Sequence, residues 1–251
     1  MAKPPGRPRK RTALFAIGGG IALIVVAFLL VYFVIFPTSS PKPFRLTSTP
    51  SSTASTASTT SSAPPSATTG SGLTGSWKVV SGSEAGYRVR EKLAFLPAQS
   101  DAVGRTSQIS GGATFSESKG TLTIAAASFD VSVDTLKSDR SMRDEKIHEI
   151  GLESNRYPTA TFAMSTPATV SASALKGTIA HVSVTGTFDI HGTPRKETIP
   201  VEMSLSGSTF EAAGSLTFPW SEFGMTAPSI GGFVNVTEKA TMEFDLRLQR
   251  G

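Results

Sequence analysis

Residues 180–192 read AHVSVTGTFDIHG, and this stretch decides the fold. Its even-numbered positions from Val182 to Ile190 are mostly apolar, whereas the odd-numbered positions from Ser183 to Asp189 are polar. Successive side chains of a β-strand point to opposite faces, so the pattern gives one apolar face and one wetted face. Such alternation is typical of an antiparallel sheet that covers a core on one side only.

The same period of two recurs in other parts of the chain. It runs through TIPVEMSLS at 198–206 and ATMEFDLRLQR at 240–250, and it predicts eight or so strands between Leu73 and Gly251. We therefore expect an all-β, antiparallel fold. A closed barrel removes the exposed sheet edges and is favoured; an open sandwich is the alternative.

One segment shifts the phase of the alternation. In TLTIAAASFDVSVDTL, residues 121–136, the apolar positions are even-numbered before the three alanines at 125–127 and odd-numbered after them. An extra residue in one strand produces such a shift, so the alanines predict a β-bulge or a corner.

Only one segment predicts a helix. It reads SDRSMRDEKIHEIG, residues 138–151, with Ser138 or Asp139 as the cap and Gly151 as the stop. The expected apolar face of this helix is modest and consists of Met142, Ile147 and Ile150. One short helix among many strands argues against a βαβ fold.

The amino-terminal residues predict a membrane anchor. Residues 13–36 are twenty-four positions without a charge, and about twenty apolar residues suffice to cross a bilayer. Five Lys or Arg residues lie in 1–12, so this end is expected in the cytoplasm and the carboxyl terminus outside. The run exceeds the roughly 7–15 residues of a signal-peptide core, and no small-x-small site follows it, which favours an uncleaved anchor over a cleaved signal peptide.

Residues 37–72 predict a disordered linker. Twenty of its thirty-six residues are Ser or Thr and six are Pro, which leaves too little apolar surface to offset the entropy of ordering. As a flexible coil it would span roughly 33 Å. The expected organisation is a basic tail (1–12), a transmembrane helix (13–36), the linker (37–72) and one β-domain (73–251).

Charge and composition exclude several classes of function. The net charge is +5, but from residue 73 onward 17 Lys and Arg face 19 Asp and Glu. The domain therefore has no basic excess for nucleic acid, and we expect no nucleic-acid partner. No cysteine occurs, so disulfides, thiolate catalysis and cysteine-ligated metals are excluded.

The sequence offers no motif for catalysis. Its histidines are His148, His181 and His191; if the last two lie on one strand, they are roughly 33 Å apart and cannot share a metal. Neither H-E-x-x-H nor G-x-S-x-G is present. We expect no catalytic residue, metal or cofactor, and interpret His191 as a turn residue and Arg143-Asp144 as a surface or helix-end pair.

Four stretches carry a family resemblance: GSWKVVSGSEAGYRVREKL (75–93), VSVDTLKSDRSMRDEKIHEIGLESNRYPTATF (131–162), GTFDIHGTPRKETIPV (186–201) and WSEFGM (220–225). Together they resemble the YceI-like, polyisoprenoid-binding family of bacterial exported proteins, over 75–248. The chain departs from the family where Glu145-Lys146-Ile147 replaces x-His-Leu, Trp220 replaces Arg and Asp189 replaces Thr. Polar roles of those family residues are not carried over.

The resemblance implies a lipocalin-like antiparallel β-barrel whose apolar cavity holds a long isoprenoid-type lipid, such as a quinone or a polyprenyl lipid. Arg143 and His191 are expected nearer the polar ends of the cavity. We expect the following residues to line it: Phe129, Phe162, Val184, Phe188, Met203, Phe218, Phe223 and Met242.

We therefore expect a lipid-binding protein, not an enzyme, in the cell membrane with its barrel outside the cytoplasm. The alternatives are a structural or stress-related envelope domain without a ligand and, less favoured, an enzyme acting on a lipid head group. The sequence leaves the oligomeric state open, with a homodimer among the options.

Overall fold

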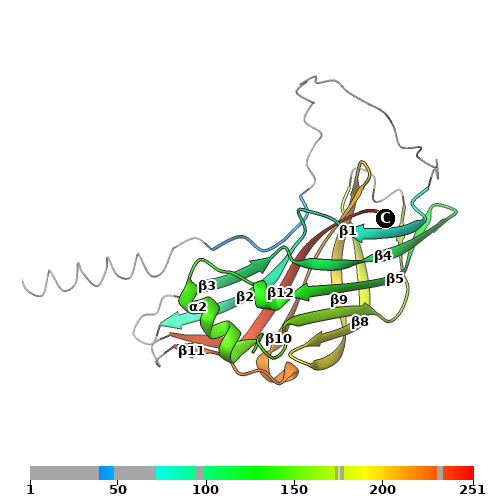
Figure 1. Cartoon of the computed structure of the whole chain (residues 1–251). Coiled ribbons are helices and arrows are strands. Elements are labelled where there is room, and N and C mark those ends of the chain that lie inside the picture. Colours follow the sequence, from blue (N-terminus) through cyan, green and yellow to red (C-terminus); the bar gives the residue numbers. More distant parts are fainter. Residues whose placement is uncertain (1–39, 48–71, 94–98, 173–174, 176–177, 231–233) are drawn as a thin grey trace, which may run out of the picture. The chain divides into compact units, whose positions relative to one another are not determined.

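The computed structural model describes residues 40–47, 72–93, 99–172, 175, 178–230 and 234–251, and the predicted span at 13–36 lies outside them (Figure 1). No helix within these ranges is long and apolar enough to cross a membrane. Strands dominate the same ranges: β1 (Gly75–Val79), β2 (Glu84–Leu93), β3 (Gln99–Thr106), β4 (Ile109–Ser118), β5 (Thr121–Ser132), β6 (Thr159–Met164), β7 (Ala168–Ser171), β8 (Ala180–Ile190), β9 (Thr193–Ser206), β10 (Thr209–Pro219), β11 (Ser229–Ile230) and β12 (Val234–Arg250).

The strands form a closed antiparallel barrel, as the alternation predicted. Neighbours pair in the order β1-β4-β5-β6-β8-β9-β10-β12, and β12 pairs with β1 again, so these eight strands make a ring. The open sandwich that was the alternative is therefore wrong. The β2–β3 hairpin extends the sheet beside the first half of β12.

Strand β12 closes the ring because it is long enough to pair with two strands on the same side. Its residues Val234–Asp245 pair with β2, and Leu248–Arg250 pair with β1. Between β1 and β2 the chain kinks at Ser83, which is 2 % exposed. The Ser83 hydroxyl donates to the Val80 carbonyl (2.9 Å) and accepts from the Arg247 amide (2.9 Å), so this buried hydroxyl is fully paired.

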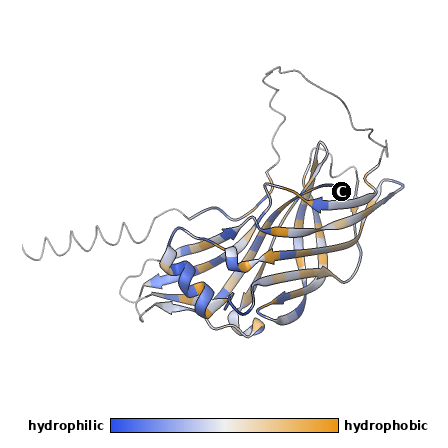
Figure 2. Ribbon diagram, viewed as in Figure 1, coloured by the Kyte–Doolittle hydropathy of each residue, from blue (hydrophilic) through white to orange (hydrophobic). Residues whose placement is uncertain are grey.

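The apolar positions of the alternating sequence face the interior of the barrel, and the polar positions face outward. In β8 the even-numbered residues from Ala180 to Ile190 are buried, and the odd-numbered ones are exposed or half-buried. Apolar and polar residues alternate along most strands of the ring (Figure 2). The predicted bulge is confirmed, because Thr114 pairs with Ala126 and Phe115 with Ile124, which leaves Ala125 as the extra residue.

The two ends of the barrel are closed differently. At one end, called here the aromatic end, Trp77, Phe115 and Phe210 pack with ring centroids 4.5 to 6.1 Å apart. Each buried ring of this kind contributes about 1.5–3 kcal/mol through its apolar surface. At the other end, called the helix end, a short helical segment covers the interior (Figure 1).

That helical segment differs from the prediction in its start and in its buried face. It consists of α2 (Ser141–Lys146) and a π-helical turn, η2 (Ile147–Gly151), and its N-cap is Arg140. The two predicted caps were therefore wrong. The Ser138 hydroxyl pairs with the backbone of Arg140, and the Ser138 amide donates to the Asp144 carboxylate.

Of the predicted apolar face only Ile147 is buried, whereas Met142 is 61 % and Ile150 36 % exposed. A π-turn holds more residues per turn than an α-helix. The residues four and five positions after Ile147 therefore face inward with it, and Ile150, three positions after it, does not. The two inward residues are Gly151 and Leu152, and both are buried.

The turn between β8 and β9 is a tight hairpin turn formed by His191 and Gly192. His191 (φ 56°) and Gly192 (φ 66°) both have positive φ, as a type I′ hairpin turn requires. This confirms His191 as a turn residue. A Cβ on Gly192 would lie 2.7 Å from Tyr157 Cε1, whereas a Cβ on Gly207 (φ 60°) would meet nothing within 4 Å.

We predict that Gly192→Ala destabilises the domain more than Gly207→Ala. Both substitutions place a side chain in left-handed backbone, at about 1–2 kcal/mol, but only Gly192→Ala also forces Tyr157 to move, at about 1–3 kcal/mol more. Chemical denaturation of both variants measures the difference. Equal losses would show that the Tyr157 contact does not matter.

Candidate functional site

The barrel encloses one large apolar cavity of about 170 Å³. Its wall is formed mainly by aliphatic, aromatic and methionine side chains from β2 and from every strand of the ring except β1. Among the lining residues, Glu243 turns its carboxylate to Arg88 and Arg105, and the Trp220 Nε1 donates to the Thr237 carbonyl. The interior can therefore hold an apolar molecule and offers it few polar contacts.

Seven of the eight residues predicted to line the cavity lie on its wall; they are Phe129, Phe162, Val184, Phe188, Met203, Phe218 and Met242. Phe223 is not among the lining residues. It is fully buried and packs edge to face on Phe218, with ring centroids 4.7 Å apart. Phe223 follows β10 in the 3₁₀ turn η4 (Trp220–Phe223), past the end of the strand, and packs in the core beside the cavity wall.

Three phenylalanines make a continuous strip across the wall. Phe129 of β5 pairs with Phe162 of β6, which pairs with Phe188 of β8. The ring centroids are 6.4 and 4.7 Å apart. Gly186 makes room for the middle ring, since a Cβ there would lie 2.2 Å from Phe162 Cε2. The strip therefore depends on a glycine in the middle of β8.

The helix end of the cavity was not found from the sequence. Its lining includes Leu136, Ile147, Leu152, Trp220 and Met225, which lie in or near short helical turns outside the alternating strands. A ring nitrogen of His148 lies 2.6 Å from Ser154 Oγ and the other 3.1 Å from the Leu136 carbonyl oxygen, which ties these turns together. No period of two marks such residues, so the pattern could not assign them.

Tyr87 lies between the cavity and a small second pocket beside α2. Its side chain is 8 % exposed and fits against Gly104, where a Cβ would lie 2.3 Å from the ring. Burial raises the pKa of the Tyr87 phenol, more than the charge of Arg143 lowers it. The Ser138 side chain also lowers this pKa, but the buried hydroxyl of Tyr87 makes no hydrogen bond of normal geometry. The Tyr87 hydroxyl is therefore a polar group beside an apolar cavity.

The second pocket contains a buried ion pair. Arg143 donates two parallel hydrogen bonds to the Glu91 carboxylate, Nε to Oε1 and Nη2 to Oε2, both 2.9 Å long. The side chains are 13 % and 6 % exposed. Although burial lowers it, the hydrogen bond and charge of Glu91 and the charge of Asp139 raise the pKa of Arg143. The interpretation of Arg143-Asp144 as a pair was wrong, because the two side chains have different partners.

The sequence contained a signal for this pair. Glu91 occupies an inward position of β2, in register with the buried Ala85, Tyr87 and Val89. An acidic residue in an apolar alternation needs a cationic partner, since an unpaired charge is costly to bury. The partner lies 52 residues away, however, and spacing could not identify it.

His191 lies at the same end of the barrel as Arg143, in the turn between β8 and β9, and does not line the cavity. Its ring is 4.3 Å from that of Tyr157, and its Nε2 is 3.5 Å from the Glu153 carboxylate. Within the described ranges, no group of three His, Cys, Asp or Glu residues is placed to hold a metal ion.

The fold and cavity can now be compared with known proteins. The model of the YceI-like domain matches residues 77–248. The chain belongs to the YceI-like domain family. A comparison with curated proteins gave no match.

Solved structures share the YceI-like fold at low sequence identity. A polyisoprenoid binding domain from Saccharophagus degradans is 14 % identical, with a TM-score of 0.51, over 71 % of this chain and 99 % of that one. A mutant of the Campylobacter jejuni YCEI protein is 14 % identical, with a TM-score of 0.50, over 64 % and 91 %. BcnA of Burkholderia cenocepacia is 21 % identical, with a TM-score of 0.47, over 65 % and 95 %.

We predict that Arg143→Ala lowers the free energy of unfolding of this YceI-like domain by about 3–5 kcal/mol, because it leaves the Glu91 carboxylate buried without a partner. Denaturant titration measures the loss. Lys146→Ala is the matched control, since Lys146 lies on the same helix and pairs with Glu149 at the surface; it is expected to leave stability almost unchanged. Similar effects of the two substitutions would contradict the prediction.

Proposed function

We propose that this protein binds a long apolar lipid of the isoprenoid type in its barrel and that residues 13–36 hold it at the outer face of the cell membrane. The observation that carries the lipid part is the apolar cavity, whose wall runs from Phe115 near the aromatic end to Met225 at the helix end. Membership of the YceI-like family and the likeness to a polyisoprenoid binding domain support it. The anchor rests on the charge-free run and the basic tail that precedes it.

The apolar side chains of the cavity wall favour a hydrocarbon ligand. Each methylene removed from water contributes about 0.8 kcal/mol, so a tail of several isoprene units binds tightly without any charged contact. Flexible methionines suit a ligand with many conformations, and Met164, Met203, Met225 and Met242 all line the cavity. Binding of this kind needs no turnover, and the proposal is a binding role.

The size of the cavity adds a condition. A dry cavity of about 150 Å³ holds one benzene molecule, so the 170 Å³ here corresponds to a single isoprene unit or little more. A longer tail must displace side chains. The helix end offers the means, because Ile147 and Leu152 belong to a short segment that is not part of the ring of strands.

The position of Tyr87 indicates where a polar head would lie. Its phenol is protonated at neutral pH, and the hydroxyl, buried at the helix end without a partner, can donate a hydrogen bond to a ligand oxygen. We therefore place the head group beside Tyr87 and the tail toward the aromatic end, where Trp77, Phe115 and Phe210 close the barrel.

A lipid that co-purifies with the protein would test the proposal directly. The full chain, purified from its membrane fraction, is extracted with organic solvent and the extract is examined by mass spectrometry. We expect a polyprenyl or quinone species in near-stoichiometric amount. The proposal would be refuted if the extract of the purified protein contained no isoprenoid and if added geranylgeraniol or decaprenol did not bind. That result would favour a structural envelope domain.

A cavity-filling variant locates the binding site. We predict that Val184→Phe weakens binding of a fluorescent polyprenyl probe at least tenfold, because the larger ring occupies the interior; overpacking costs about 1–3 kcal/mol of stability. Ser183→Phe is the matched control, since Ser183 is the exposed neighbour on the same strand. Equal affinities of the two variants would place the lipid outside the barrel.

A further inference from the structure

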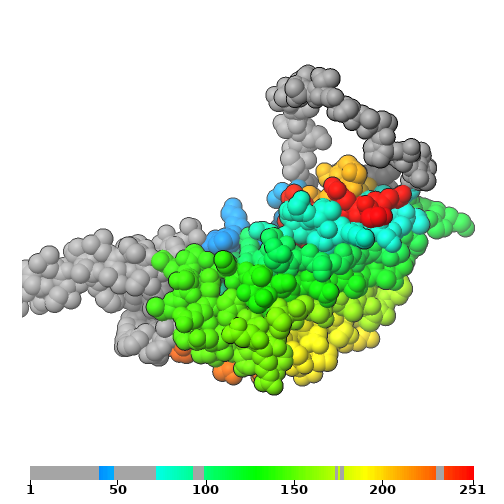
Figure 3. Space-filling model, viewed as in Figure 1, coloured from blue at the N-terminus to red at the C-terminus, as the bar shows by residue number. Residues whose placement is uncertain are grey.

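A short segment from the predicted linker lies on the outside of the barrel. Residues Pro41–Thr47 belong to the same compact unit as the barrel, and Figure 3 shows this stretch in blue on the molecular surface. Phe44 and Leu46 are half-buried, whereas their neighbours are exposed, as expected for an extended segment with one face against the protein. We call residues 41–47 the strap.

The surface beneath the strap is centred on Glu243. This residue points outward from β12, yet its side chain is only 2 % exposed. Arg88 of β2 donates to both of its carboxylate oxygens, and Arg105 of β3 donates to one of them, each at 3.1 Å. A charge buried on the outside of a barrel requires both paired cations and a cover.

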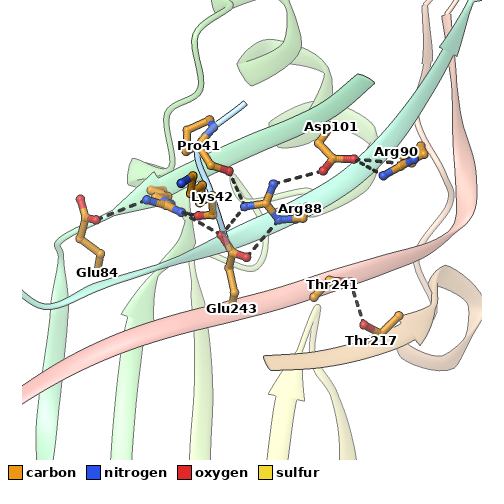
Figure 4. A network of polar contacts seen from close by, with 10 residues as sticks. Pro41, Lys42, Glu84, Arg88, Arg90, Asp101, Thr217, Thr241 and Glu243 are labelled. Carbon is orange, nitrogen blue, oxygen red and sulfur yellow. Dashed lines mark hydrogen bonds and ion pairs between the residues drawn. The ribbon is translucent and has the colours of Figure 1, made fainter. Parts of the chain in front are cut away.

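The strap supplies part of that cover with its backbone. Arg88 Nη2 donates to the Pro41 carbonyl at 2.8 Å, and Arg105 Nη2 donates to the Lys42 carbonyl at 2.7 Å (Figure 4). The ring of Phe44 lies 3.8 Å from the Arg105 guanidinium carbon, which is a close cation–π contact. The two arginines therefore bind Glu243 and the strap together.

A second contact holds the other end of the strap. Arg45 Nη1 and the Leu46 amide each donate a hydrogen bond of 2.9 Å to the Glu202 carboxylate of β9. Although partial burial raises it, these two hydrogen bonds and the charge of Arg45 lower the pKa of Glu202 below its usual value. The barrel thus contacts the strap at two places, through cations at one and an anion at the other.

The composition of the linker independently singles out the same residues. Every charged, aromatic or large aliphatic residue between 37 and 72 lies in 42–46. The following stretch, 47–72, contains only Ser, Thr, Ala, Pro and Gly. The residue types that can bind a folded surface are therefore concentrated where the contacts occur.

The strap has a defined direction on the barrel. Arg88, which binds Pro41, pairs with Thr241 of β12. Glu202, which binds Arg45, pairs with Ala213 of β10, and Ala213 pairs with Asp245 of β12. The two contacts of the strap therefore lie at the level of Thr241 and of Asp245. Strand β12 runs from the helix end to the aromatic end, so the strap runs the same way. Its first residue is the one nearer the helix end, where the helical segment covers the cavity.

We propose that the strap is a permanent docking segment. The chain between the predicted span and the docked strap is then residues 37–40, called here the tether, and not the whole predicted linker. Four residues reach at most about 14 Å, whereas thirty-six would reach about 125 Å. The tether, not the whole linker, then sets the distance between the barrel and the membrane. The membrane part of this inference rests on the anchor proposed above; the docking itself does not.

Docking is tested without a membrane. The chain lacks cysteine, so spin labels can be placed at Thr47→Cys and Gln249→Cys, both exposed positions, in the full chain in detergent. We expect a narrow distance distribution that broadens with Phe44→Ser and Arg45→Ser together. Lys42→Ser is the control and should keep it narrow, because Lys42 binds through its carbonyl. A broad distribution in the parent chain, or no effect of the double substitution, overturns the proposal.

The tether is tested by where added length matters. Ten Gly and Ser residues are inserted after Ser40 or after Thr60 in the vesicle-bound chain, and energy transfer from a label at Thr217→Cys to the lipid surface is measured. Only the first insertion should raise the barrel, by roughly 10 Å, because a flexible coil lengthens with the square root of its residue number. Equal effects overturn the tether. A chain released from the membrane would refute the anchor instead, while the spin-label result would still decide the docking.

Discussion

The pairing of β12 on both sides is the constraint on which the rest of the structure depends. One side of this strand pairs with β10, and the other accepts β2 and then β1. Without that double pairing the sheet would stay open and its edges would be exposed. The kink at Ser83 makes the arrangement possible, because it lets two consecutive strands follow one partner while the Ser83 hydroxyl bridges the Val80 carbonyl and the Arg247 amide.

Closure turns the apolar face of each strand toward a shared interior, and the choice of side chains then shapes that interior. Large rings meet at the aromatic end and fill it, whereas glycines at 104 and 186 leave niches in which Tyr87 and Phe162 fit. The helix end is covered by a segment outside the ring. The result is an apolar cavity with one end filled by packed rings and one end whose cover is held by side-chain contacts, such as those of His148 and Arg143. This asymmetry suits a ligand with a tail and a head.

The sequence predicted those features that follow from local periodicity. The period of two assigned the β-class and a bulge within the alanines at 125–127, because inward and outward positions are fixed by the strand itself. Together with the resemblance it led to eight expected wall residues, of which seven line the cavity. It failed where geometry is not periodic. The π-turn moved Ile150 outward, the 3₁₀ turn placed Phe223 in the core beside the cavity wall, and Glu91 found a partner 52 residues away. The strap was missed for another reason: it is too short to show a period, and its few charged and apolar residues were counted with the whole of 37–72.

The strap also has a mechanical consequence. A pull on the chain at residue 40 reaches the contacts of Pro41, Lys42 and Arg45 with the barrel before it reaches Gly75, where β1 begins. Load applied at residue 40 is therefore carried by two arginines and a glutamate on three different strands. The short β1, whose pairing with β12 completes the ring, stays outside the load path as long as the strap holds.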